Sequence, residues 1–237
     1  MNCRLTLMLG SIVLVGWLPG GAHAQQPERA PDTMAARMLA CTPCHGSLGQ
    51  GTHDDYFPRL AGKPSGYLYN QLLAFREGRR RYPPMNYLLE FLHDDYLHEI
   101  ADYFAAQRPP LVPHDPPTVS KDVMAHGKDL ATKGDPKRSI PACVSCHGPS
   151  LTGMEPAIPG LIGLHARYII AQLGAFRYGT RTAPSPDCMQ IVTGHLTAED
   201  ANALAAWLSV QPVSPDPSPV PRGSLTMPLH CGSEPSG

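Results

Sequence analysis

Apolar residues recur at helical spacing in several stretches of this 237-residue chain, between longer polar segments that contain proline. This spacing is typical of amphipathic helices. It predicts helices over residues 34–40, 65–77, 94–106, 123–133, 166–178 and 197–209. Gly78 and Gly179 follow two of these helices at C-cap positions, and Thr197 is suited to an N-cap. No stretch alternates as a strand would, so the sequence predicts an all-α fold.

The helical pattern occurs twice, with an offset of about a hundred residues. The clearest copy runs from Tyr67 through Gln71, Phe75 and Arg76 to Arg80, and it is matched from Tyr168 through Gln172, Phe176 and Arg177 to Arg181. Pro58 and Pro159 begin matching turns upstream. Repetition over this length indicates duplication of a whole domain, and we expect the two domains at residues 25–110 and 121–210.

The segments outside the repeat differ in composition. Arg4, an apolar run over residues 5–18 and the small residues Ala22 and Ala24 predict a secretory signal peptide at residues 1–24. The apolar run is short for a membrane span, although an uncleaved anchor is the alternative. Residues 111–120 are rich in proline and predict a linker. Residues 211–237, rich in proline and serine, predict an irregular C-terminal tail.

Charge is nearly balanced, with a formal net charge of −1. Proteins that bind nucleic acid carry clustered basic residues, and neither domain shows such an excess. The composition therefore predicts no nucleic-acid partner and gives no sign of binding to a strongly charged membrane surface.

Each domain contains the sequence Cys-x-x-Cys-His, and this motif is typical of covalent haem attachment. Two thiols on one helical turn can form thioethers with the vinyl groups of haem, and the histidine can then bind the iron. A redox dithiol would need a βαβ pattern, and a Cys₄ zinc site would leave both histidines without a role. The sequence predicts two covalently bound haem c groups, attached at Cys41, Cys44, Cys143 and Cys146, with His45 and His147 as axial ligands.

Two cysteines remain outside the haem motifs and the predicted signal peptide, Cys188 and Cys231. An isolated pair in an oxidising compartment usually forms a disulfide. We therefore expect a bond between them, which would be the only attachment of the tail to the second domain. Two unpaired thiols are the alternative.

A second axial ligand must follow each haem motif at a distance, so that the chain can reach the opposite face of the ring. Met85 and Met189 stand at equivalent places in the two domains, in polar segments with prolines that predict loops. They are the expected ligands, because a thioether suits an electron-transfer haem. The alternatives are a thiolate from Cys188 or one of the histidines His53, His93, His98, His165 and His195.

Other repeated residues are suited to hold the haem in place. A carbonyl near Pro58 or Pro159 could accept a hydrogen bond from the Nδ1 of the proximal histidine and so fix its ring. The repeated arginines could pair with haem propionates. These are Arg76 and Arg177, and Arg80 and Arg181.

Together these motifs resemble the dihaem cytochrome c4 family. Both domains contain Cys-x-x-Cys-His-Gly, then Pro-x-Leu-x-Gly, then Tyr-x-x-x-Gln-Leu-x-x-Phe-Arg-x-Gly-x-Arg, a later methionine and a final helix. The resemblance implies two tandem class I cytochrome c domains related by a pseudo-twofold axis, with haem edges close enough for internal electron transfer. The tail and the pair Cys188 and Cys231 depart from the family pattern.

We therefore expect a periplasmic electron carrier without catalytic residues. It would pass single electrons from a quinol-oxidising complex or a dehydrogenase to a terminal oxidase or reductase, and it could dock on membrane complexes. The alternative is a dihaem redox enzyme of the thiosulfate-oxidising or peroxidase type. That function would need a labile or thiolate-ligated haem, and Cys188 is the feature in its favour.

Overall fold

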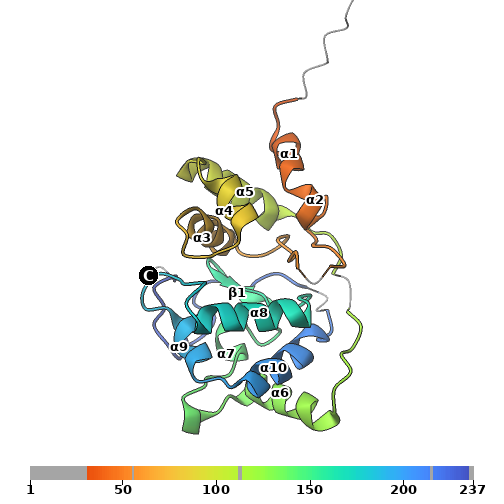
Figure 1. Ribbon diagram of the computed structural model, residues 1–237, viewed down its shortest axis with the longest axis vertical. Coiled ribbons are helices and arrows are strands. Elements are labelled where there is room, and N and C mark those ends of the chain that lie inside the picture. Colours follow the sequence, from red (N-terminus) through yellow and green to blue (C-terminus); the bar gives the residue numbers. More distant parts are fainter. Residues whose placement is uncertain (1–30, 55, 112–113, 214–215, 235–237) are drawn as a thin grey trace, which may run out of the picture. The chain divides into compact units, whose positions relative to one another are not determined.

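The computed structural model describes residues 31–54, 56–111, 114–213 and 216–234. Its helices and strands belong to one compact unit, Asp32–Gly237 (Figure 1). The predicted signal peptide, residues 1–24, lies outside the described residues. Within the described ranges, no helix is long and apolar enough to cross a membrane.

The first domain is built from short helices. In chain order they are α1 (Met34–Arg37), η1 (Met38–Ala40), α2 (Thr42–His45), α3 (Ser65–Arg76), α4 (Pro83–Leu89) and α5 (Asp94–Ala106). Helices α3 and α5 pack against each other. Their contact buries Leu68 and Phe75 of α3 against Leu97 and Phe104 of α5, which forms the core of this domain.

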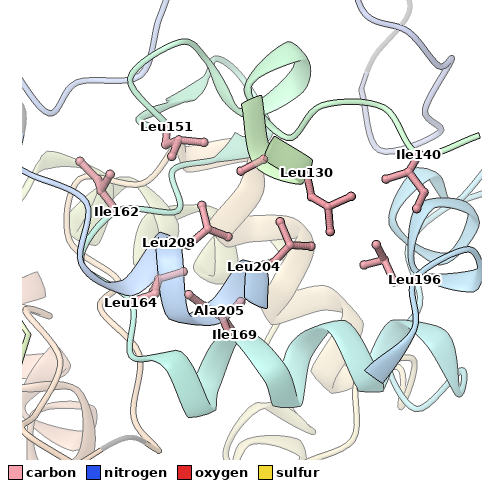
Figure 2. Packing of buried hydrophobic residues seen from close by; sticks show 11 residues of the cluster. Leu130, Ile140, Leu151, Ile162, Leu164, Ile169, Leu196, Leu204, Ala205 and Leu208 are labelled. Atoms are coloured by element: carbon pink, nitrogen blue, oxygen red, sulfur yellow. The ribbon is translucent and has the colours of Figure 1, made fainter. Parts of the chain in front are cut away.

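The second domain repeats this order with small additions. Its elements are α6 (Lys121–Lys133), η2 (Pro136–Arg138), α7 (Val144–His147), β1 (Gly153–Met154), β2 (Ile158–Pro159), α8 (Ala166–Arg177), α9 (Cys188–Gly194) and α10 (Ala198–Ser209). Figure 2 shows the leucines of α6 and α10 in its core, with Ile169 of α8 below them. Helices α6 and α10 approach so closely that a Cβ on Gly127 would lie 2.0 Å from the carbonyl oxygen of Ala203. Only glycine allows this contact.

The predicted helices are all present, and their ends lie within one or two residues of the expected positions. Gly78 and Gly179 have φ of 73° and 68°, the left-handed conformation that ends helices α3 and α8. Thr197 caps α10, and Asp200 completes a capping box with it. Strong periodicity together with cap residues therefore located these helices correctly.

The predicted all-α fold class is confirmed, but two features of the irregular regions differ from expectation. The chain contains a small antiparallel sheet in which β1 pairs with β2, with Gly153 opposite Pro159. Strands of two residues are too short to produce an alternating pattern, so the sequence did not reveal them. The tail is also attached at more than Cys231, because Val220 forms a parallel bridge with Met154 and so extends this sheet.

Candidate haem-binding sites

The two Cys-x-x-Cys-His motifs have the same local structure. Each begins at the N-cap of a short helix, α2 or α7, and each histidine donates its backbone N–H to the carbonyl of the first cysteine. The helical turn places both thiols of a motif on one side. The glycines that follow, Gly46 and Gly148, have φ of 81° and 87°, so the chain leaves the helix directly after the histidine.

None of the four motif cysteines forms a disulfide. Burial raises the pKa of Cys143 to about 12, and it also raises the pKa of Cys41 and Cys146. A redox-active dithiol works as a thiolate and has a lowered pKa, so these environments disfavour that alternative.

Both proximal histidines are buried and oriented by the same hydrogen bond. His45 Nδ1 donates to the carbonyl oxygen of Pro58 at 3.1 Å, and His147 Nδ1 donates to that of Pro159 at 2.7 Å. This confirms the expected carbonyl partners. Burial lowers the pKa of both imidazoles, so they are neutral and keep Nε2 as a lone-pair donor for a metal.

A cavity of about 190 Å³ lies beside the motif of the second domain. It is lined by four of the residues predicted to bind haem there, Cys143, Cys146, His147 and Met189. The rest of its wall is mainly apolar and includes Leu130, Ile140, Leu164, Ile169, Leu173, Phe176, Leu196, Leu204 and Leu208. This donor set fits haem c, which needs two thiols for attachment and an imidazole and a thioether as axial donors.

The first domain arranges its predicted ligands in a similar way. Cys41 and Met85 both pack against the hydrophobic cluster formed by α3 and α5. His45 is buried and has a T-shaped ring contact with Phe57, with centroids 6.3 Å apart. The same donor types therefore gather around the core of each domain.

Comparisons with known proteins identify this architecture. The cytochrome c family model matches residues 124–211. The chain is 36% identical over 203 residues to cytochrome c4 of Pseudomonas aeruginosa, which covers 85% of this chain and 96% of the relative. The chain belongs to the cytochrome c4 family. It is also 33% identical over 215 residues to a thiosulfate dehydrogenase electron acceptor from Thiomonas intermedia, covering 91% of this chain and 94% of that relative.

A solved structure of the family agrees in fold. Reduced cytochrome c4 from Pseudomonas stutzeri matches with a TM-score of 0.66 at 31% identity, over 75% of this chain and 96% of that one. The chain thus consists of two tandem cytochrome c domains and carries electrons rather than acting as an enzyme. A cytochrome c domain binds haem c covalently.

The two predicted methionine ligands lie on helices, which corrects the expectation of loops. Met85 is in the first turn of α4, and Met189 is the second residue of α9. Prolines at the start of α4 were interpreted as loop signals, but proline is well tolerated at the first positions of a helix. Met189 still faces the cavity of the second domain.

The histidines considered as alternative distal ligands have other environments. His53, His93 and His195 are exposed, and exposed His98 stacks on Tyr69 with centroids 3.6 Å apart. His165 is the N-cap of α8, and its Nε2 donates to the carbonyl oxygen of Thr52 at 3.2 Å. None of these side chains lines the cavity beside His147.

Cys188 forms a disulfide with Cys231, across a sequence separation of 43 residues. The pairing expected from the sequence is therefore present, and the alternatives of free thiols and of a thiolate ligand from Cys188 are wrong for this structure. The bond attaches the tail at the residue next to Met189. Met227 and Leu229 of the tail line the same cavity, a feature that no sequence periodicity indicated.

The repeated arginines bind groups of the protein itself. Arg76 donates to the carbonyl of Leu92 and pairs with Asp94, and Arg177 donates to the carbonyl of Leu196. Each guanidinium thus joins the end of one helix, α3 or α8, to the segment before the last helix of its domain. Pairing of the arginines with haem propionates stays a prediction.

Arg80 and Arg181 make reciprocal contacts between the domains. Arg80 donates to Tyr168 Oη and Gln172 Oε1, both at 2.9 Å, and to Gln71 Oε1 at 3.1 Å. In return, Arg181 donates to Tyr67 Oη at 3.0 Å, Gln71 Oε1 at 2.7 Å and Gln172 Oε1 at 2.8 Å. We call these six side chains the arginine exchange.

The backbone repeats this reciprocity. Arg81 N donates to Thr180 O at 3.1 Å, and Thr182 N donates to Arg79 O at 2.8 Å, around an antiparallel bridge between Arg80 and Arg181. Equivalent residues of the two domains thus give and receive equivalent bonds, as a local twofold relation requires. The repeated Tyr, Gln and Arg positions were visible in the sequence, but their partners in the other domain were not.

Proposed function

We propose that this chain is a periplasmic dihaem carrier of single electrons. One haem c is attached at Cys41 and Cys44 with His45 and Met85 as axial ligands. The other is attached at Cys143 and Cys146 with His147 and Met189 as axial ligands. Haem c, when bound, supplies an iron that alternates between the ferric and ferrous states.

The observation that carries the proposal is the presence of one complete donor set in each domain. A histidine with a fixed ring and a methionine with a soft thioether would serve as the two axial donors of a bound haem, and this pair would leave no open position for a substrate. The protein then has little chemistry to perform beyond holding the ligands, excluding water and tuning the potential. His45 and His147 are held by their Pro58 and Pro159 carbonyl partners.

The alternative function as a redox enzyme depends on a free thiol at Cys188. A thiolate-ligated haem in the second domain would need a free Cys188, and this residue is bonded to Cys231. The relative from Thiomonas intermedia is named as the electron acceptor of thiosulfate dehydrogenase. By similarity, this name supports a dehydrogenase as the electron donor of the present chain, while a quinol-oxidising complex is the second candidate.

A periplasmic location is supported by the predicted signal peptide at residues 1–24 and by the disulfide. Structural disulfides form and persist in oxidising compartments such as the bacterial periplasm. Release of a shortened mature chain into the periplasmic fraction, detected by mass spectrometry of its N-terminus, is the expected result. A full-length chain in the membrane fraction would contradict it.

A spectroscopic redox titration of the purified protein tests the ligands. We expect two haems per chain, and in the ferric state the red charge-transfer band typical of methionine ligation should come from both. Met85→Ala and Met189→Ala should each remove about half of this band. Met124→Ala, which changes a methionine of α6 outside the cavity lining, is the matched control. A full band in Met189→Ala would disprove this ligand.

The donor is tested by stopped-flow mixing with purified enzymes. The oxidised protein is mixed with thiosulfate dehydrogenase and thiosulfate, or with a quinol-oxidising complex and quinol. We expect rapid reduction with one of these donors and slow reduction with the small reductants alone. Equal rates with and without the enzymes would refute the carrier function.

A further inference from the structure

The two domains differ in the side chains near their haem-binding motifs. In the first domain, Tyr56 and Tyr82 form a T-shaped pair with ring centroids 5.3 Å apart, and Phe57 contacts Tyr56 at 5.5 Å. Phe57 in turn contacts the ring of His45. A series of aromatic rings therefore leads from the proximal histidine to Tyr56, whose surface is 59% exposed.

Aromatic side chains are also exposed at the other end of α4. Tyr87 is 77% exposed, and Phe91, four residues later, is 79% exposed. We call Tyr56, Tyr82, Tyr87 and Phe91 the aromatic surface. Large apolar side chains that cluster on the outside of a protein usually mark an interaction site. The presence of tyrosine and phenylalanine fits this, because aromatic residues are enriched at protein interfaces.

The equivalent positions of the second domain contain no Phe, Tyr or Trp. Counted from the matching prolines and methionines, they are Ala157, Pro186, Ile191 and His195. The second domain therefore does not repeat this surface, and the two domains are unequal at these positions.

The tail covers part of this region in the second domain. We call residues 220–234 the C-terminal strap. Gly232 N donates to Pro186 O at 2.9 Å, and the carboxyl of Glu234 lies near the backbone N–H of Ala157. Pro186 and Ala157 are the counterparts of Tyr82 and Tyr56, so the strap contacts two of the four equivalent positions, while Ile191 and His195 are exposed. Gly232 fits only as glycine, because a Cβ would lie 2.2 Å from Ser185 O.

Exposed acidic residues lie close in sequence to the aromatic surface. Asp54 accepts a hydrogen bond from Tyr56 N at 2.8 Å, and exposed Glu90 and Asp95 lie on either side of Phe91 in the sequence. Arg81 is the basic residue next to Tyr82. An apolar centre with a mainly acidic border is complementary to a partner with an apolar centre and a basic border.

We propose that the aromatic surface of the first domain is the docking site for a redox protein with an apolar contact area surrounded by basic residues. This inference rests on the proposed carrier function. The second domain lacks Tyr and Phe at the equivalent positions, so electrons exchanged with this partner pass through the first domain. Small, transient interfaces of this kind are typical of electron-transfer proteins.

The test measures electron exchange between the holoprotein and a basic mitochondrial cytochrome c as the probe. One electron moves from the reduced probe to the oxidised protein, and stopped-flow spectra follow both. The docking variant combines Tyr87→Ser with Phe91→Ser, at side chains that are mostly exposed. The matched control combines Ile170→Ser with Tyr178→Ser, exposed apolar residues of α8 and its C-cap in the second domain.

We expect the docking variant to lower the second-order rate constant by about tenfold, and the control to stay within about twofold of the parent protein. Reduction of all three proteins by hydroquinone, which needs no docking, should be equally fast. A second-order rate constant of the docking variant within about twofold of the parent value would overturn the proposal, and so would an equally large fall in the rate constant of the control. A parent protein that hydroquinone cannot reduce would instead show that the carrier function fails.

Discussion

Arg181 is the most buried member of the arginine exchange, and its replacement by alanine should destabilise the contact between the domains. Its side chain is 6% exposed and donates three hydrogen bonds, while its guanidinium lies 4.4 Å from the centroid of the Phe176 ring. Arg181→Ala removes these bonds. Gln71 and Gln172 keep Arg80 as a donor, but Tyr67 loses its partner.

Two effects oppose each other in this variant. A hydrogen bond to a charged group contributes about 1.5–3 kcal/mol, and breaking a buried charged contact costs about 3–5 kcal/mol. Against this, burial and the nearby charge of Arg80 lower the pKa of Arg181, so its removal relieves some unfavourable charge. Because three bonds and a ring contact are lost, we expect a net loss of about 3 kcal/mol.

The assay is urea unfolding of the haem-loaded protein, followed by far-ultraviolet and haem circular dichroism. In the parent protein, the two signals should change over the same range of urea concentration. In Arg181→Ala, the urea concentration at the midpoint should fall, and the unfolding transitions of the two domains should separate. Arg79→Ala, in the same loop with a partly exposed ion pair to Glu77, should cost less than about 1 kcal/mol. A loss below about 1 kcal/mol in Arg181→Ala would refute this reasoning.

The remaining predictions concern the tail and the acid stability of the second domain. Replacing Cys188 and Cys231 together by serine should lower the free energy of unfolding by about 2–4 kcal/mol, because the disulfide closes a long loop. A change below about 1 kcal/mol, measured by urea unfolding, would contradict this prediction. Burial raises the pKa of Asp200, but hydrogen bonds from Arg138, Thr197 and His126 outweigh it and hold this pKa well below its usual range. The ionised carboxylate therefore stabilises the fold above about pH 4, and this contribution is lost as the pH falls further. Asp200→Asn should flatten the loss of stability between about pH 4 and pH 2, whereas Asp129→Asn, on the exposed surface of α6, should not.

The sequence predicted the features that depend on neighbouring residues. Helix α5 could be located because its apolar positions are periodic over the whole of residues 94–106. Thr197 could be identified as a cap because a cap acts within one turn. The carbonyl partners of His45 and His147 followed from the repeat, since both motifs are succeeded by the same turn.

Contacts between distant segments could not be predicted in the same way. The donors of the arginine exchange were visible as repeated residues, but a guanidinium can bind a propionate, its own domain or the other domain with similar chemistry. Apart from the predicted disulfide at Cys231, the C-terminal strap is held by backbone groups, as at Val220 and Gly232, which leave no pattern in the side chains. Helix α4 was missed because its prolines are compatible with both a loop and a helix start.

The arginine exchange has a consequence for the origin of the molecule. Each domain provides a tyrosine and a glutamine that accept hydrogen bonds from the arginine of the other domain. Each domain also provides the arginine that donates to this pair in the other domain. A chain with one such domain would therefore already possess both halves of a self-complementary interface, which two identical copies could complete across a true twofold axis. Fusion of the two copies would then have kept the existing arginine exchange, and no new contact between the domains would have been needed. Afterwards either copy could change alone, as the strap on one side and the exposed rings on the other show.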